Sequence, residues 1–275
     1  MNRRYSRLVV PHKAGDGTLV ALLWTHAPLG FDESAGDLVA FFREAAAARD
    51  ACDALRRRRV RFALTTDIPE RDPLEAYRAA SRPFAVGRRF WLEPGEEGGG
   101  AVPEGRIALR VPASRAFGTG SHASTRLALE ALEDEPLSGR SVLDVGTGSG
   151  VLALAAAALG ARSVVGLDLD PDAVFVARGN AGSHAFGASV RLYAGVVGAC
   201  GGRFDLVVAN MLADEILAEA RGIRLRVARR GRVLLSGITR DRETAVLARM
   251  RSGRWKLAGR RAEDEWISLT LERVA

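Results

Sequence analysis

The sequence of 275 residues is poor in cysteine and has no long hydrophobic run. Cys52 and Cys200 stand alone, without the close spacing of metal ligands, so we expect two thiols that are buried or inert, and no metal site. The longest apolar run, Val151–Leu159, is far shorter than a membrane span. The basic N-terminus leads into no apolar signal segment. These absences predict a cytoplasmic protein without membrane contact.

Lysine is almost absent too, since Lys13 and Lys256 are the only two in the chain. Arginine therefore carries nearly all the positive charge behind a formal net charge of +7 and an isoelectric point of about 10.3. A basic surface attracts polyanions such as RNA. Scattered arginines are equally typical of a compositional bias, so both interpretations stay open. The run Arg56–Arg59 suits the C-terminal end of a helix, where cations are favoured.

Residues 1–68 have the pattern of a small α+β domain. Strands are expected at 7–10, 30–34, 37–42 and 60–66, and helices at 18–25 and 45–58. The order β-α-β-β-α-β predicts a ferredoxin-like sandwich. Residues 69–83 are expected to be a linker with a short helix at 74–80. Strands at 84–92 and 107–111 flank the loop 93–100, which we interpret as a mobile hairpin tip or a lid.

Helices and strands alternate from residue 124 onward, within a second domain that we place at 84–275. Strands are expected at 141–145, 163–167, 189–193, 204–209, 232–237, 255–259 and 266–271, and helices at 125–132, 151–159, 171–180 and 241–250. A further helix is expected to follow the strand at 204–209 and to end near residue 220. Alternating units predict a doubly wound α/β domain with a parallel sheet and helices on both faces. The last two of the seven strands are close enough in sequence to form an antiparallel hairpin.

A glycine-rich turn joins the strand at 141–145 to the following helix. Gly146, Gly148 and Gly150 let the backbone approach a ligand closely, and the helix N-terminus offers free N–H groups. The dinucleotide fingerprint would have a third glycine at Val151, and the phosphate loop Gly-Lys-Ser/Thr is absent. The turn predicts a ligand site of another kind, although a plain strand–helix connection would use the same glycines.

Asp168 is expected at the end of the next strand, beside the glycine-rich turn. A carboxylate there can accept hydrogen bonds from both ribose hydroxyls of a nucleoside. Asp170 stands before Pro171 and suits the N-cap of a helix. We therefore assign Asp168 to a nucleoside cofactor and Asp170 to capping, and an NAD enzyme is compatible with the same acidic residue.

Small residues dominate the segment that precedes the helix at 125–132. Phe117, Gly118 and Thr119 suit a loop that folds over a ligand. His122 either positions a substrate, acts as a base or holds the loop structurally. Thr125 either hydrogen-bonds the cofactor or begins the helix. Asn210, which ends the fourth strand of the sheet, offers an amide donor and acceptor at the same edge, with a turn-forming role as the alternative.

Taken together, these motifs resemble the bacterial methyltransferase family of large-subunit ribosomal protein eleven. The matching runs are 117–122, 124–125, 143–150, 166–171 and 208–213, with Gly237-Ile238 and Glu265-Trp266 near the C-terminus. The resemblance is specific over residues 81–275 and loose over 5–68. It implies a seven-stranded class I, Rossmann-like methyltransferase domain, whose distinctive ending is the terminal antiparallel hairpin. The positions that match the family's cofactor contacts are Thr125, Gly146, Asp168 and Asn210.

The resemblance also implies the reaction and the partners. The methyl donor would be S-adenosylmethionine, and the acceptors would be lysine side chains and an N-terminal amine of that ribosomal protein. The N-terminal domain would hold the protein substrate, and the linker would swing it over the catalytic domain. We expect a monomer, with ribosomal RNA as a further contact suggested by the charge. The segment 72–74 lacks a tryptophan expected for the family.

The residues after Asn210 bear on the acceptor. Many amino-methyltransferases have Asn-Pro-Pro-Tyr where this chain has Asn210, Met211, Leu212 and Ala213. Without an aromatic ring at that place, the motif favours an aliphatic amine, with Met211 and Leu212 along its methylene stem. Asn210 would align the amine for in-line attack on the methyl group, and water would take the proton. The alternatives are a lysine of another protein, an RNA base, and a binding module without catalysis.

Overall fold

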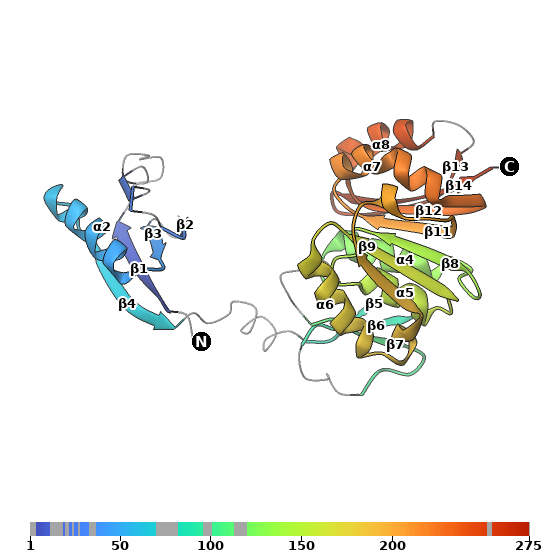
Figure 1. Cartoon of the computed structure of the whole chain (residues 1–275), viewed down its shortest axis with the longest axis horizontal. Helices are drawn as coiled ribbons and strands as arrows, with labels where there is room; N and C mark the ends of the chain where they lie inside the picture. The colour runs from blue at the N-terminus through green and yellow to red at the C-terminus, as the bar shows by residue number, and fades with distance from the viewer. Residues whose placement is uncertain are drawn as a thin grey trace. The chain divides into compact units, whose positions relative to one another are not determined.

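The chain divides into two compact units, Met1–Pro73 and Leu74–Ala275, each of which is described by itself (Figure 1). The computed structural model describes residues 4–11, 19, 22–23, 25–26, 28–32, 37–69, 82–95, 101–112, 120–251 and 255–274. The predicted helix at 74–80 and the predicted loop residues Phe117, Gly118 and Thr119 lie outside these ranges.

The N-terminal unit contains an antiparallel sheet in the order β2-β3-β1-β4 and a helix packed against it. The elements are β1 (Arg4–Pro11), β2 (Gly30–Asp32), β3 (Asp37–Phe42), α2 (Ala45–Arg57) and β4 (Ala63–Pro69). The helix buries Ala48, Ala51 and Leu55 against Leu8 and Phe42. The predicted hairpin and helix are confirmed, with Arg56 and Arg57 in the last helical turn.

The strand predicted at 60–66 begins later, at Ala63. Val60 donates its N–H to the carbonyl of Leu55 at 3.1 Å, and Arg59 has a φ of 55°, so this segment closes the helix and does not extend the sheet. The helix predicted at 18–25 lies mostly outside the described residues. The ferredoxin-like assignment of this unit therefore stays a prediction.

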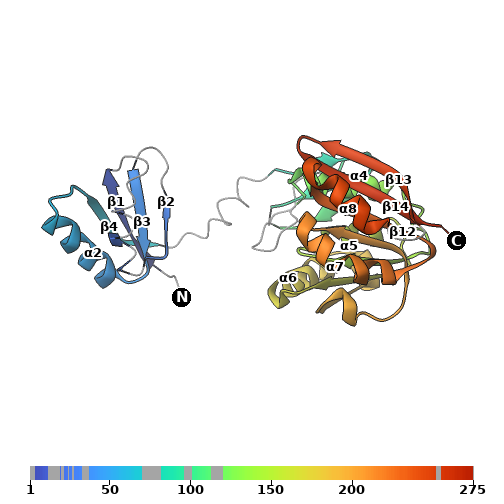
Figure 2. The same ribbon diagram turned by 90° about the horizontal axis from the view of Figure 1, so that it is seen from above.

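The larger unit is built on a seven-stranded sheet in the order β10-β9-β8-β11-β12-β14-β13. Its strands are β8 (Ser141–Val145), β9 (Ser163–Asp168), β10 (Val190–Ala194), β11 (Phe204–Asn210), β12 (Val227–Thr239), β13 (Trp255–Glu263) and β14 (Trp266–Arg273). The first five are parallel, and β14 pairs antiparallel with both β12 and β13 at one side of the sheet (Figure 2). The predicted doubly wound sheet with a terminal antiparallel hairpin is confirmed.

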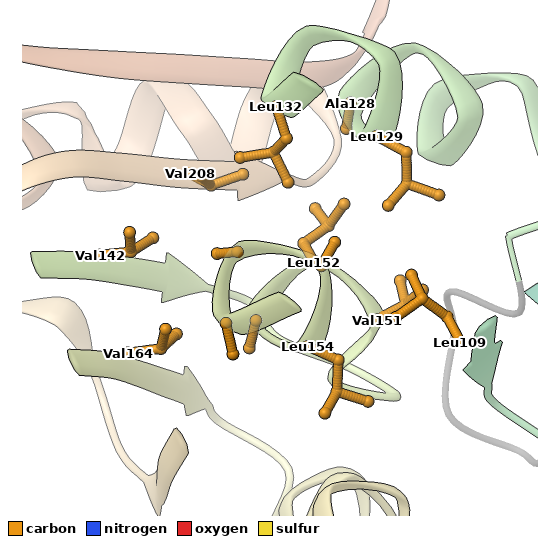
Figure 3. Packing of buried hydrophobic residues seen from close by; sticks show 14 of the residues in the cluster. Leu109, Ala128, Leu129, Leu132, Val142, Val151, Leu152, Leu154, Val164 and Val208 are labelled. Atoms are coloured by element: carbon orange, nitrogen blue, oxygen red, sulfur yellow. The ribbon is translucent and has the colours of Figure 1, made fainter. Parts of the chain in front are cut away.

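Helices cover both faces of this sheet and enclose two separate cores. The helices are α4 (Ala123–Glu133), α5 (Val151–Ala158), α6 (Pro171–Gly182), α7 (Ala213–Arg226) and α8 (Glu243–Met250). The helices α4, α5 and α6 pack on one face, where Leu129, Leu152 and Leu154 meet Val142 and Val164 (Figure 3). The helices α7 and α8 pack on the other face. No helix in the described part of the chain is long and apolar enough to span a membrane.

The larger unit also contains a small three-stranded sheet that packs onto the first core. It consists of β5 (Phe84–Val86), β6 (Phe90–Glu93) and β7 (Ile107–Arg110) in the order β5-β6-β7. The single strand predicted at 84–92 is therefore two strands, because Gly87, with a φ of 55°, turns the chain back on itself. The Glu133 carboxylate of α4 accepts the N–H groups of Arg88 and Arg89 at 2.9 and 2.8 Å and anchors this turn.

Candidate active site

A cavity of about 770 Å³ opens at the carboxyl ends of the parallel strands. Loops after β8, β9, β10 and β11 line it, together with the start of α4 and residues of β12 and β14. Seven predicted site residues lie in its lining: His122, Gly146, Gly148, Asp168, Asn210, Met211 and Leu212. The volume is that of a pocket for a small molecule. The topology therefore brings motifs from four strands into one site.

The glycine-rich turn forms one wall of the cavity. Gly146 and Gly148 have φ angles of 69° and 53°, which only glycine adopts without strain. A Cβ on Gly146 would lie 2.8 Å from Cγ and Sδ of Met211, so the glycine also allows Met211 to pack against the turn. Bare backbone at these positions lets a ligand approach the main chain closely.

Gly150, which the sequence assigns to the cofactor, does not line the cavity. It is the N-cap of α5, with a φ of 83°, and a Cβ there would lie 3.1 Å from the Cβ of Ala177 on α6. The structure thus places this glycine where two helices meet, and its role is to start α5 and let α6 approach. Its contact with a cofactor stays a prediction.

Asp168 ends β9 and presents its carboxylate to the cavity. Its Oδ2 accepts the N–H of Gly148 at 2.8 Å, and its Oδ1 accepts the N–H of Asp170 at 3.0 Å. These bonds hold the side chain in one orientation beside the carboxyl ends of the paired strands β8 and β9. Asp170 itself accepts the N–H of Asp172 at 2.8 Å, so its predicted role as the N-cap of α6 is confirmed.

Asn210 ends β11 on the other side of the glycine-rich turn. Its Nδ2 donates to Oγ1 of Thr125 at 3.1 Å, which fixes the direction of the amide group. Its Oδ1 is buried and has no hydrogen-bond partner among the described residues. A buried acceptor left unpaired costs free energy, so this atom is poised to receive an N–H from a ligand.

Thr125 is fully buried in the first turn of α4 and is absent from the cavity lining. Its predicted direct contact with the cofactor stays a prediction, and what the structure shows is support for Asn210. The helix is itself docked on the sheet, because Oγ of Ser236 donates to the carbonyl of Ser124 at 2.7 Å. The carbonyl of Ser236 also accepts the N–H of Met211 at 3.1 Å, so β12 holds both sides of the Thr125–Asn210 pair.

Gly237 lines the cavity beside this pair and has a φ of 79°. A Cβ on Gly237 would overlap the carbonyl oxygen of Met211 and lie 3.1 Å from Oδ1 of Asn210. Any larger residue would therefore displace the Asn210–Met211 segment. Its spacing in the sequence revealed no such role, and only the family match singled it out.

His122 and Trp266 meet in the lining of the cavity. Their rings lie edge to face, with centroids 4.8 Å apart and planes at 71°. His122 is also the N-cap of α4 and accepts the N–H of Ser124 on Nδ1 at 3.3 Å, so the structural role considered for it is present. Trp266 supplies an aromatic ring that the motif around Asn210 lacks. The family match included Trp266 in the sequence but not its place in the cavity, because β14 reaches the site only through sheet pairing with β12.

The described lining of the cavity carries negatively charged side chains and no lysine or arginine. Its carboxylates are those of Asp168, Asp170, Glu215 and Glu219. Carboxylates grouped around a concave, partly apolar surface favour a cationic ligand and disfavour a phosphate. Described residues hold no cluster of three or more potential metal ligands.

Asp144 lies beneath the glycine-rich turn and is fully buried. Its Oδ2 accepts the hydroxyl of Thr147 at 2.7 Å and the N–H of Ala153 at 3.1 Å, which ties the turn to α5. Its Oδ1 has no partner among the described residues. Burial, with a smaller contribution from the negative charge of Asp168, raises the pKa of Asp144 from 3.8 to about 6.

Known proteins resemble the chain over most of its length. A family model described as ribosomal protein L11 methyltransferase (PrmA) matches residues 29–274. The ribosomal protein L11 methyltransferase of Geobacter metallireducens is 40% identical over 204 residues, which are 74% of this chain and 67% of that protein. The one from Symbiobacterium thermophilum is 41% identical over 203 residues, 74% of this chain and 66% of that protein. The chain thus spans about two thirds of their length.

The crystal structure of ribosomal protein L11 methylase from Lactobacillus delbrueckii subsp. bulgaricus is similar in fold. It aligns with a TM-score of 0.65 at 28% sequence identity and covers 71% of this chain and 100% of that chain.

Replacing Asp144 with asparagine should change how stability depends on pH. Because the folded-state pKa is raised, this carboxyl favours the folded state at low pH, and that contribution is lost as pH rises from about 4 to about 6. The new amide keeps an acceptor without the buried charge. The free energy of unfolding of Asp144→Asn should therefore rise relative to that of the parent as pH rises from about 4 to about 7. The expected gain is up to about 3 kcal/mol, because a pKa raised by one unit corresponds to about 1.4 kcal/mol. Urea unfolding at several pH values measures the difference.

A matched control is Asp205→Asn, which should show the opposite sign. Burial raises the pKa of Asp205, but hydrogen bonds from Ser141 and the charge of Arg140 outweigh it and leave the pKa lowered. The carboxylate of Asp205 thus stabilises the fold above its unfolded pKa, and its removal should cost stability as pH rises. A pH-independent difference between Asp144→Asn and the parent would show that Asp144 does not titrate in this range.

Proposed function

Because this chain belongs to the ribosomal protein L11 methyltransferase family, we propose that it transfers methyl groups from S-adenosylmethionine to amino groups of ribosomal protein L11. The acceptors are lysine side chains and an N-terminal amine. The observation that carries the proposal is the buried, unpartnered Oδ1 of Asn210 in a cavity lined by carboxylates. Such a site suits a cationic methyl donor and an amine that must be held by a hydrogen bond.

The residues present fit S-adenosylmethionine. The carboxylate of Asp168, already oriented by Gly148 and Asp170, can accept the ribose hydroxyls. Gly146 and Gly148 lie in the cavity lining and have no side chain to cover the main chain there, while Met211 packs beside Gly146. When bound, S-adenosylmethionine supplies a methyl group that is already activated by a positive sulfur. The protein therefore has to bind and align, and it does not need a metal or a strong acid.

Asn210 positions the attacking amine. Its Oδ1 accepts an N–H of the amine, and Thr125 prevents the amide from rotating. Lysine is cationic in water, with a pKa near about 10.4, so a proton must leave before attack. The four carboxylates of the lining attract the cationic side chain to the cavity, and water takes the proton. Met211 and Leu212 offer apolar contact to the methylene stem.

An RNA base is the second candidate acceptor, and one observation favours it. The ring of Trp266 in the cavity lining can stack on a flipped base, as enzymes that modify nucleic acids require. Against it stand the carboxylates of the lining, which repel the phosphates on both sides of a flipped base. We therefore prefer the amine, with Trp266 packing against the lysine stem.

The N-terminal unit has a separate role in this proposal. Residues 1–68 recognise the protein substrate, 69–83 act as a linker, and 84–275 carry methyl transfer. Support comes from the division into two compact units and from the cavity, whose described lining residues all belong to the larger unit. The protein acts as a monomer in the cytoplasm and contacts ribosomal RNA.

Asp168→Ala should weaken binding of S-adenosylmethionine by about 1–3 kcal/mol, because two ribose hydroxyls would lose their acceptor. Titration calorimetry with the purified chain measures the loss. Asp170→Ala is the matched control, since that carboxylate caps α6 and should affect stability more than cofactor affinity. Equal affinities for the parent and Asp168→Ala would remove this residue from the site.

Asn210→Ala should lower kcat by about 100-fold, a loss typical of a misaligned reacting group, with a much smaller change in KM for the protein substrate. Leu212→Ala is the comparison, since that side chain, 60% exposed in the same loop, contacts only the methylene stem in this proposal and its loss should raise KM with little change in kcat. For the parent chain, the rate should rise with pH as the amine loses its proton. A raised KM at unchanged kcat would make Asn210 a simple binding residue.

The acceptor itself is tested by supplying purified ribosomal protein L11 and purified ribosomal RNA in separate reactions with labelled S-adenosylmethionine. Label is expected in the protein, and mass mapping should place it on lysine and N-terminal amines. Label in the RNA alone would contradict the proposal and support the base-stacking role of Trp266.

A further inference from the structure

The end of the sheet opposite the cavity carries a group of exposed arginines. Arg140, Arg162 and Arg203 each stand directly before a strand, at the starts of β8, β9 and β11. Arg229 and Arg230 lie in β12, where the pairing with β11 shifts register between Val227 and Arg232. Because these strands are parallel, their amino ends share one edge of the sheet. We refer to Arg140, Arg162, Arg203, Arg229 and Arg230 as the arginine face.

The loops that carry the arginine face touch one another. Arg162 donates its N–H to the carbonyl of Arg140 at 2.8 Å, which joins the starts of β8 and β9. Asp205, two residues after Arg203, accepts the N–H of Ser141 at 2.9 Å, which joins β11 to β8. A Cβ on Gly231, next to Arg230, would lie 3.0 Å from the carbonyl oxygen of Asp205. The five arginines are therefore neighbours and not merely scattered along the chain.

Little negative charge opposes this face. Arg140 lies 3.5 Å from Asp205, a distance typical of a loose ion pair. Within the described part of the chain, the side chains of Arg162, Arg203, Arg229 and Arg230 form no ion pair or hydrogen bond. The flanking carboxylates of Glu135 and Glu272 are already paired with Arg232. Four guanidinium groups are thus available for a partner.

The backbone at Arg230 gives a second, independent indication. Its φ of 59° lies in the left-handed region, where glycine or asparagine is favoured over a long side chain. The next residue, Gly231, would suit the left-handed conformation better, yet Arg230 is the residue that adopts it. An arginine held in this conformation at the tip of an exposed bulge projects its charge into solvent at a cost in backbone energy.

We propose that the arginine face binds the phosphate backbone of RNA. Arginine presents a planar fork of donors that matches phosphate oxygens, and several such groups on one surface track a polyanion. The inference rests on the proposed function, because a ribosomal protein substrate is encountered beside ribosomal RNA. The cavity's carboxylates repel the same polyanion. One end of the sheet is therefore acidic and the other end basic.

This arrangement separates anchoring from catalysis. The arginine face lies at the amino ends of the strands and the cavity at their carboxyl ends, so RNA bound to one leaves the other open to a protein side chain. The RNA would act as a docking platform that raises the local concentration of the enzyme near its substrate. It would not be the methyl acceptor.

The experiment uses the full chain with four substitutions, Arg162→Gln, Arg203→Gln, Arg229→Gln and Arg230→Asn. Asparagine suits the left-handed backbone at position 230, and Arg140 keeps its pairing with Asp205. Binding of a labelled RNA hairpin is measured over a series of salt concentrations. We expect affinity to fall by about tenfold or more, and the slope of log K against log salt to fall by about 3, for four lost phosphate contacts. Methylation of free ribosomal protein L11 should keep its parental rate.

The matched control removes the same charge from the other unit, by Arg7→Gln, Arg49→Gln, Arg57→Gln and Arg58→Gln, all at exposed positions. It should retain most RNA affinity, and an equal loss in both variants would show a bulk charge effect and overturn the proposal. Tighter binding of the parent to vesicles of phosphatidylglycerol and phosphatidylcholine than to RNA would overturn it in favour of a membrane. A parent chain that binds RNA but does not methylate L11 would count against the proposed function and leave the arginine face supported.

Discussion

The parallel register of β9, β8 and β11 is the constraint from which the site follows. Asp144 of β8 lies opposite Gly166 of β9, and Val145 lies opposite Ala209 of β11, so the three strands end at nearly the same level. A side chain that ends any one of them is therefore delivered to the same edge as the others. The glycine-rich turn, Asp168 and Asn210 are far apart in sequence and adjacent in space for this reason alone.

Buried polar groups then define what the site can do. Asp144 and Thr125 are fully buried and Asn210 is half-buried, and each satisfies part of its hydrogen-bonding capacity within the protein. The polar atoms that remain unpaired indicate which ligand the site can bind, because an unpaired buried acceptor is costly and selects a ligand that can donate a hydrogen bond to it. Oδ1 of Asn210 is such an atom, in a residue that lines the cavity. Rigid support from β12, through Ser236 and Gly237, keeps that atom in place.

The same parallel sheet gives the larger unit two ends of opposite charge. Carboxylates gather around the cavity at the carboxyl ends, and the arginine face lies at the amino ends. In a chain with a net charge of +7, the positive charge is thus not spread evenly over this unit. A sulfonium cofactor and the lysine side chain of the proposed function are both cations, and a cavity lined by carboxylates attracts cations and repels phosphates.

Local spacing in the sequence determined the alternation of helices and strands, the glycine-rich turn, and the positions of Asp168 and Asn210 at strand ends. These features depend on residues close together in the chain, and hydrophobic periodicity with turn residues encodes them directly. The capping role of Asp170 is likewise local, because it needs only the next helical turn. The sequence also suggested the terminal hairpin, since two strands stood close together without a helix between them.

Only the tertiary structure decided which atoms meet. It placed Gly150 against α6, paired Thr125 with Asn210, and brought Trp266 of β14 to the cavity through an antiparallel pairing that no local pattern specifies. The same holds for the arginine face, whose members look scattered in sequence and become neighbours at one edge of the sheet. Such contacts join residues distant in the chain. These contacts are selected jointly by packing, by strand register and by the need to pair buried polar groups. None of these three constraints can be read from a short segment of the sequence by itself.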